Sequence, residues 1–375
     1  MRIAIVLGPF QPTPPVGHGA VEKVWHDLAQ VFARFGHVVQ LIGKAGFRPA
    51  IDEDKGGIQV VPVRGFSATG RLWLDLLKDF VYALEVRRRI EPSDVIVTNT
   101  FWTPVLLSLF GWRLGKIIVH VARFPKGQMW LYRGADALQA ISSVVAQEIV
   151  RQSPGVREKV HVLPYPVDLH TYRPPDVARR YDGDLTILYV GRIHPEKGVD
   201  LLITALRQLL TRVPRARLRI VGPLALEQGG GGEVYFEALR SAATGLPVEF
   251  VGPIREPTVL ALEYQRAHCF CYPSLAEKGE AFGIAALEAM ATGLPVVVSD
   301  LACFRDFIEA GRDGLVFDHR ARAPETALGE LMGQILADPD FALQLGRNAA
   351  DKAQDFELEK IARRYIGFFE EIARS

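Results

Sequence analysis

Two carboxylates flank a short apolar run in the last third of the chain. Glu280 and Glu288 enclose the residues Ala-Phe-Gly-Ile-Ala-Ala-Leu, a composition that predicts a short helix beginning near Phe282 and Gly283. If both carboxylates lie on this helix, they stand roughly 12 Å apart along its axis and about 80° apart around it. They are then too far apart to act on one small substrate atom, but they can hold two parts of an elongated ligand.

The start of this predicted helix suits a phosphate group. The N–H groups near Phe282, Gly283 and Ile284 have no partner inside a helix, and the helix dipole is positive there. Gly283 lets a ligand approach the backbone closely. The pattern therefore fits a ligand made of a sugar, a diphosphate and a nucleoside ribose. The plainer alternative is an amphipathic helix with exposed glutamates, but strand-like runs at residues 268–272 and 294–298 frame the segment on both sides.

A second group of charges follows a predicted strand about ninety residues earlier. Arg192 and Lys197 lie within the sequence Gly-Arg-x4-Lys-Gly, between a strand and a helix. An arginine and a lysine at this position could neutralise a diphosphate leaving group, at roughly 3–4 kcal/mol for each well-placed group. The alternative is a surface loop with two solvated cations.

Two further positions in the first half could carry chemistry. Gly17 and Gly19 follow the first predicted strand and permit close backbone approach to a ligand. They do not form a dinucleotide fingerprint, because Glu22 stands at the third glycine position, and a structural turn is the alternative. His120 ends a strand, and its isolation is more typical of a satisfied core residue than of a catalyst.

Strands and helices alternate along the whole chain. Apolar runs predict first-half strands at residues 3–7, 38–42, 58–63, 95–98, 117–121 and 137–141, with helices at 20–35, 72–90 and 144–151, and second-half strands at 186–190, 217–221, 248–251, 269–272, 295–299 and 315–317. This alternation predicts an α/β protein with two doubly wound, Rossmann-like parallel sheets. Ligands bind such sheets at the carboxyl ends of the strands, in a cleft that we expect between two domains.

Prolines and charges at residues 166–183 predict a linker. We therefore expect a first domain at residues 1–165 and a second at 184–356. Residues 357–375 show helical spacing of apolar side chains and predict a final helix.

These residues resemble a known family, the retaining glycosyltransferases of family 4 (glycosyl transferases group 1), which have the GT-B fold. The resembling segments are Gly191-Arg192-x4-Lys197-Gly198, Pro273-Ser274, Glu280-Ala281-Phe282-Gly283, Glu288-Ala289-Met290-Ala291 and Gly293-x-Pro295-Val296-Val297. The chain departs from the usual family text at Ala281, where glycine is usual, and at Tyr165-Pro166, where Asn-Gly is usual.

The resemblance implies a role for each candidate residue. Glu280 would bind the donor sugar and Glu288 the ribose hydroxyls, while Arg192 and Lys197 with the helix start at Phe282, Gly283 and Ile284 would hold the diphosphate. The loop of Gly17 and Gly19 would lie near the donor phosphates, the loop of Ile254 would contact the base through its backbone, and His120 would orient the sugar and support the transition state. His120 and Glu280 are thus the expected catalytic residues, and the final helix would cross back onto the first domain, which binds the acceptor.

The function implied is sugar transfer with retention from a nucleotide-diphosphate sugar to a hydroxyl of a glycan, a lipid-linked or a small-molecule acceptor. Two alternatives stay open: a sugar-nucleotide epimerase of the same fold, and a non-catalytic nucleotide-sugar-binding subunit. No cofactor or metal is expected, because no Asp-x-Asp triplet ends a strand at a nucleotide pocket and no His/Cys group has zinc spacing.

Composition limits the remaining partners. The net charge of +1 gives no general attraction to nucleic acid. The residues 1–7 predict a strand instead of a signal peptide, no apolar run is long enough to cross a bilayer, and the three cysteines form no disulfide framework, so we expect a cytoplasmic protein. Aromatic and basic residues mix at 64–89 and 123–132, where peripheral contact with anionic lipid competes with a plain core-facing helix.

Overall fold

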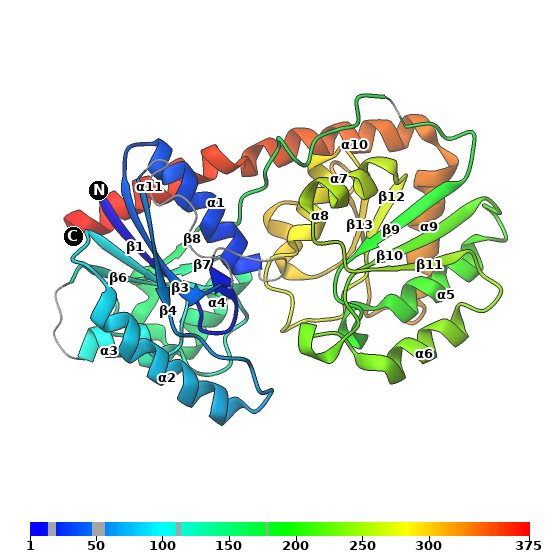
Figure 1. The fold of residues 1–375 in the computed structure, drawn as a ribbon. Coiled ribbons are helices and arrows are strands. Elements are labelled where there is room, and N and C mark those ends of the chain that lie inside the picture. Colours follow the sequence, from blue (N-terminus) through cyan, green and yellow to red (C-terminus); the bar gives the residue numbers. More distant parts are fainter. Residues whose placement is uncertain (14–19, 47–56, 110–113, 178) are drawn as a thin grey trace. The chain divides into compact units, whose positions relative to one another are not determined.

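The computed structural model describes residues 1–13, 20–46, 57–109, 114–177 and 179–375, which form two compact units (Figure 1). The first unit comprises Met1–Pro166 and Leu358–Ser375, and the second comprises Val167–Glu357. Each unit is a parallel sheet covered by helices on both faces, as the alternation of strands and helices predicts.

In the first unit, the sheet has the order β2-β3-β1-β5-β6-β7-β8, and β4 pairs with β3. Its strands are β1 (Arg2–Val6), β2 (Pro12–Thr13), β3 (Val38–Ala45), β4 (Ile58–Val63), β5 (Val95–Thr98), β6 (Lys116–Val121), β7 (Ala137–Ala140) and β8 (Val160–Val162). Its helices are α1 (Ala20–Arg34), α2 (Leu72–Arg89), α3 (Thr103–Leu109), α4 (Ser143–Gln152) and α11 (Leu358–Arg374). The central strands are buried on both faces, which explains their continuous apolar sequences.

The last helix, α11, belongs to the first unit although it ends the chain. Its Tyr365 and Phe369 rings meet Trp25 and Phe32 of α1 edge to face, with centroid distances of 5.4 and 5.8 Å. Such aromatic pairs stabilise a contact beyond the area they bury. The apolar spacing seen in the sequence is therefore the face that α11 turns toward α1. The two helices lie side by side, with α11 in red in Figure 1.

In the second unit, the sheet has the order β11-β10-β9-β12-β13-β14. Its strands are β9 (Leu185–Val190), β10 (Ala216–Val221), β11 (Val248–Gly252), β12 (Cys269–Tyr272), β13 (Val296–Ser299) and β14 (Leu315–Phe317). Its helices are α5 (Val199–Leu209), α6 (Gly232–Ala242), α7 (Pro257–Arg266), α8 (Ile284–Ala291), α9 (Pro324–Ala337) and α10 (Pro339–Ala353). The order reverses between β9 and β12, so the loops that follow these two strands lie side by side at the carboxyl edge of the sheet.

One residue of the segment expected as a linker, Arg179, contacts the second unit. The Arg179 guanidinium donates hydrogen bonds to the carbonyls of Ala267, Thr292 and Gly293 at 2.9, 2.8 and 2.7 Å. These carbonyls lie at the ends of α7 and α8, where helices leave acceptors unpaired and favour a positive charge. The prediction of a linker at 166–183 rested on its prolines and charges, and one of those charges, Arg179, connects the segment to the ends of two helices of the second unit.

Among the described residues, none of the helices combines the length and the apolar composition that a membrane crossing requires.

Candidate functional site

Two loops that meet at the switch point of the second sheet carry most of the predicted donor-site residues. The loop after β9 contains Arg192 and Lys197, and the loop after β12 contains Glu280. Gly198 allows the two loops to touch: its φ is +66°, and a Cβ atom there would stand 2.2 Å from the Pro273 carbonyl oxygen. A side chain at position 198 would therefore push the loops apart.

Lys197 and Glu280 form a buried ion pair across these loops. The Lys197 Nζ atom donates to the Glu280 Oε2 atom at 2.7 Å, and the two residues are only 4% and 8% exposed. The ammonium also lies 5.7 Å from the centre of the Tyr272 ring. Removing one partner would leave the other charge buried and unpaired. The pair therefore holds the two loops together.

Arg192 is also paired, but closer to solvent. It donates to Glu196 Oε1 and to the Gly229 carbonyl, both at 2.6 Å, and its side chain is 40% exposed. The Tyr189 hydroxyl in turn donates to the Arg192 carbonyl at 2.8 Å. An anionic ligand could exchange with Glu196 at this guanidinium at low cost, because an exposed ion pair contributes little net stability.

The helix α8 begins two residues later than predicted. Gly283 precedes it with a φ of +82°, and a Cβ atom at this position would lie 2.4 Å from the Phe304 ring. Glu280 therefore lies in the loop before the helix, and the spacing of roughly 12 Å and 80° derived for one continuous helix was wrong. The Phe282 side chain is buried against Phe307, so only its backbone, with that of Gly283 and Ile284, remains for a ligand.

Glu288 lies on α8 and is half buried. Its Oε2 atom accepts a hydrogen bond of 2.9 Å from the hydroxyl of Tyr264, which is fully buried. Burial raises the pKa of Tyr264 well above its usual value, and the Glu288 charge adds to this shift. The tyrosine therefore stays a hydrogen-bond donor and holds the carboxylate in one orientation.

Ile254 follows β11 and is half buried, at the same carboxyl edge of the sheet as the loops after β9 and β12.

His120 is a satisfied buried side chain in the first unit. Its Nδ1 atom bonds Gln139 Oε1, and its Nε2 atom lies 3.1 Å from the Tyr165 hydroxyl. Burial lowers the pKa of His120 to about 4, so the imidazole is neutral at pH 7. The Gln139 oxygen can only accept, which places the imidazole proton on Nδ1 and lets Nε2 accept from Tyr165. Within the first unit His120 is thus a buried side chain with a partner at each ring nitrogen, and its role toward a donor sugar stays a prediction.

Gly17 and Gly19 lie outside the described residues. Among the residues that are described, no three or more His, Cys, Asp or Glu side chains gather in a way that could hold a metal ion.

Two tyrosines join the site without having been predicted from the sequence. Tyr264 orients Glu288, and Tyr272 lies beneath the ammonium of Lys197. Burial raises the pKa of Tyr272 well above its usual value, and the neighbouring Glu280 charge adds to the effect. The sequence signal for Tyr272 is its place at the end of β12, directly before Pro273.

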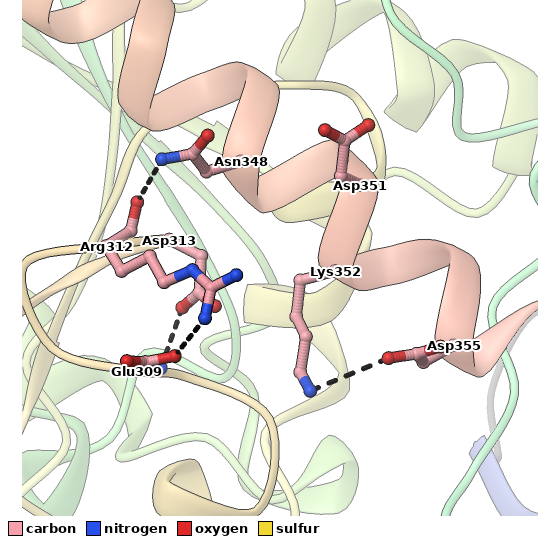
Figure 2. A pocket seen from close by; sticks show the side chains of 7 residues that line it. All are labelled: Glu309, Arg312, Asp313, Asn348, Asp351, Lys352 and Asp355. Carbon is pink, nitrogen blue, oxygen red and sulfur yellow. Dashed lines mark hydrogen bonds and ion pairs between the residues drawn. The ribbon is translucent and has the colours of Figure 1, made fainter.

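A cavity of about 270 Å³ elsewhere in the second unit includes none of these residues (Figure 2). Its lining is charged and consists of Glu309, Arg312, Asp313, Asn348, Asp351, Lys352 and Asp355. Several of these side chains pair with one another, for example Arg312 with Glu309 at 2.8 Å. The cavity is therefore separate from the switch-point site.

Comparison with known proteins places the two units in one enzyme family. Residues 175–352 match the model for glycosyl transferases group 1, and residues 19–166 match the model for the glycosyl transferase 4-like domain. A D-inositol 3-phosphate glycosyltransferase of Nocardioides sp. is 30% identical over 260 residues, which is 65% of this chain and 55% of the relative. The chain spans about half the length of the curated relatives it matches.

Solved structures show the same fold. Sucrose-phosphate synthase from Thermosynechococcus elongatus superimposes with a TM-score of 0.80 at 23% identity, over 100% of both chains. The Anabaena protein HepE in complex with UDP-glucose gives a TM-score of 0.75 at 18% identity, over 99% of this chain and 100% of HepE. With both domain models matched and with two Rossmann-like units of the GT-B type, the chain belongs to the glycosyl transferases group 1 family.

Proposed function

We propose that this protein transfers a sugar from a nucleotide-diphosphate sugar to an acceptor hydroxyl, with retention of anomeric configuration. The observation that carries the proposal is the convergence of Arg192, Lys197 and Glu280 at the switch point of the second sheet. Two cations on the loop after β9 suit a diphosphate, and the carboxylate that pairs with Lys197 suits sugar hydroxyls.

The donor would bind along the carboxyl edge of the second unit. The diphosphate would take Arg192 from Glu196 and contact the backbone N–H groups at the start of α8, while Glu288, oriented by Tyr264, would accept hydrogen bonds from the ribose. The sugar would meet Glu280, whose carboxylate is shared with Lys197. The loop of Ile254 would contact the base through its backbone. Since HepE was solved with UDP and with UDP-glucose, a uridine donor is the first to test.

The departing phosphate would take the acceptor proton on the same face of the sugar. Arg192 and Lys197 would stabilise its charge during departure, and electrostatic stabilisation of this kind often lowers the activation barrier more than any other effect. We propose that these side chains and the start of α8 carry the diphosphate charge without a metal ion. His120 is neutral, so its proposed part is to orient the sugar and support the transition state, not to accept the proton.

The first unit would bind the acceptor, which we propose to be a glycan, a lipid-linked sugar or a small polar molecule. The family relatives include D-inositol 3-phosphate glycosyltransferases, and this makes a phosphorylated polyol a sensible first acceptor to try.

We also propose that the first unit contacts an anionic membrane from the cytoplasmic side. The helix α2 exposes Trp73, Leu77 and Val81, which are spaced four residues apart on one face and are 65%, 55% and 49% exposed, and Leu72 at its start, which is 75% exposed. Arginines lie at both ends of the helix. Apolar side chains flanked by cations suit the boundary of an anionic bilayer.

Sedimentation with vesicles containing anionic lipid tests this surface. We expect the wild-type protein to sediment at low salt, and Trp73→Ala with Leu77→Ala to remain in solution. Leu226→Ala, which removes an exposed apolar side chain from the second unit, is the matched control. A wild-type protein that stays in solution at low salt overturns the membrane proposal.

The activity is tested by incubation with a panel of nucleotide sugars and acceptors in the presence of EDTA. The expected result is release of nucleoside diphosphate together with a glycosylated product whose anomeric configuration, measured by NMR, equals that of the donor. An inverted product refutes retention, and an epimerised sugar nucleotide without acceptor points to an epimerase. Binding of the donor without turnover favours a non-catalytic subunit.

A further inference from the structure

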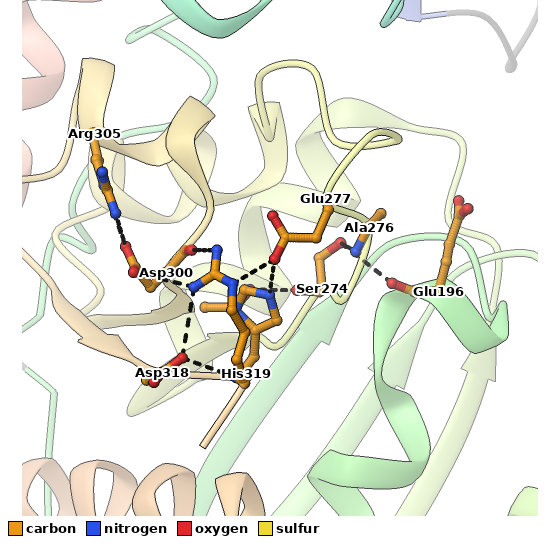
Figure 3. Close-up of polar contacts among 10 residues, drawn as sticks. Glu196, Ser274, Ala276, Glu277, Asp300, Arg305, Asp318 and His319 are labelled. Carbon is orange, nitrogen blue, oxygen red and sulfur yellow. Dashed lines mark hydrogen bonds and ion pairs between the residues drawn. The ribbon is translucent and has the colours of Figure 1, made fainter. Parts of the chain in front are cut away.

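A network of charged side chains connects three loops at the carboxyl edge of the second sheet. The loops follow β12, β13 and β14, and they contribute Glu277, Asp300 and the pair His319 and Arg320. Figure 3 shows Glu277 turned toward His319, with Asp300 between Arg305 and the loop of Asp318. Because these three strands are neighbours in the sheet, the network spans the part of the edge from which the Glu280 loop rises.

Arg320 is the centre of this network. Its Nε atom donates to Glu277 Oε1 at 2.6 Å, its Nη2 atom donates to the Asp300 carbonyl at 2.9 Å, and its Nη1 atom lies 3.3 Å from Asp300 Oδ2. The Nε2 atom of His319, a side chain only 5% exposed, lies 2.9 Å from the same Glu277 oxygen. The Arg320 guanidinium is the largest cause that holds the pKa of Glu277 below its usual value.

Hydrogen bonds within the loop from Leu275 to Glu280 couple the position of Glu280 to that of Glu277. The backbone N–H groups of Gly279 and Glu280 both donate to the Ala276 carbonyl, at 3.0 and 2.9 Å, which closes a tight turn. At its other end the loop is anchored to the segment after β9, because the Leu275 N–H donates to the Glu196 carbonyl at 2.8 Å. A turn fixed in this way moves as a unit, so a shift of Glu277 displaces Glu280.

We infer that Arg320 is a positioning residue that, together with His319, holds the Glu277 turn so that Glu280 meets the donor sugar. The inference rests on the proposed function for the role of Glu280, but the clamp itself stands on contacts within the second unit. A free nucleoside diphosphate lacks the sugar that Glu280 would contact, and it would meet this region only through Lys197 and the start of α8. Release of the clamp should therefore weaken binding of the sugar nucleotide more than binding of the free nucleotide.

Arg305 provides a matched control within the same network. It donates to Asp300 Oδ1 at 2.7 Å and is 68% exposed in its side chain. Within the part of the chain that the structure describes, it has no hydrogen bond or ion pair with Glu277. Arg305→Ala and Arg320→Ala thus remove the same charge from the same cluster, but only Arg320→Ala releases the turn.

Hydrogen exchange of the ligand-free protein tests the clamp independently of any activity. We expect the amides of residues 275–281 to exchange about fivefold faster in Arg320→Ala than in wild type, and at the wild-type rate in Arg305→Ala. Arg320→Lys, which retains one charged donor, should give an intermediate rate. Equal exchange in Arg320→Ala and Arg305→Ala overturns the clamp.

Calorimetric titration tests the effect of the clamp on the affinity for the sugar nucleotide. In Arg320→Ala the affinity for the sugar nucleotide should fall about fivefold while the affinity for the free nucleoside diphosphate stays within about twofold of wild type. Parallel losses for both ligands contradict the positioning role. If the wild-type protein binds no nucleotide or sugar nucleotide, the proposed function fails, and the exchange measurement still decides whether the clamp exists.

Discussion

Breaking the Lys197–Glu280 pair should destabilise the second unit much more than removing both charges. Glu280→Gln leaves an ammonium that is 4% exposed without its carboxylate, and Lys197→Met leaves a carboxylate that is 8% exposed without its cation. Each single change should cost about 3–5 kcal/mol. The double change Lys197→Met with Glu280→Gln leaves no buried charge and should lie within about 2 kcal/mol of wild type.

Urea and thermal unfolding of the ligand-free protein measure this coupling. For a unit of this size, a loss of about 3 kcal/mol lowers the melting temperature by roughly 6–12 °C. The loss should be nearly independent of salt, because buried charges are poorly screened. Glu309→Ala, which breaks the exposed pair with Arg312, is the control and should cost less than about 1 kcal/mol. A double variant whose loss equals the sum of the single losses would refute the argument.

Three further predictions concern other residues. Gly283→Ala should cost about 1–3 kcal/mol of unfolding free energy, measured in urea, because of its φ of +82° and the 2.4 Å contact with Phe304; an unchanged midpoint would contradict this. Tyr264→Phe removes the donor to Glu288 and should weaken binding of the nucleoside diphosphate about fivefold by calorimetry, and equal affinity would show that this orientation is unimportant. Burial raises the pKa of Asp79 from 3.8 to about 6, so its contribution to stability is complete below pH 3.8 and is lost as the pH rises through 6, by about 3 kcal/mol. The free energy of unfolding of Asp79→Asn, measured in urea, should therefore rise relative to that of wild type from pH 4 to pH 8. A difference between the two proteins that is the same at both pH values would contradict the pKa shift.

Most of the strands and their alternation with helices could be predicted from the sequence, but the short strands β2 and β8 were missed. Parallel strands buried on both faces leave continuous apolar runs, and β5 or β12 can be located by such runs alone. Arg192 and Lys197 could be placed at the ligand edge for the same reason, because they directly follow the strand β9.

The details of the site depend on contacts between distant segments, which no local pattern reveals. The start of α8 is set by Gly283 and its close approach to Phe304, so a helix assumed to begin earlier gave the wrong geometry for Glu280. The pairing of Lys197 with Glu280 joins residues far apart in the chain. The sequence gives no sign that Arg179 contacts the ends of α7 and α8, because these helix ends lie far from it along the chain.

The structure shows a contact made by Tyr165, which departs from the family pattern at Tyr165-Pro166. The Tyr165 hydroxyl lies 3.1 Å from His120 Nε2, and Gln139 occupies the other ring nitrogen. A residue noted in the sequence only as an unusual replacement therefore supplies a hydroxyl partner to the second ring nitrogen of the buried histidine.

The most direct test of the central claim is thermal stabilisation of the protein by nucleoside diphosphates and their sugars, measured first without metal and then with magnesium. At a ligand concentration of about a hundred times Kd, binding adds about 2.7 kcal/mol to the stability of the native state. The proposed site predicts a rise of several degrees without metal for one donor, and a much smaller rise in Arg192→Ala and Glu288→Ala. A rise of the same size in both variants, or no rise with any member of the panel, would contradict a donor site at the switch point of the second sheet.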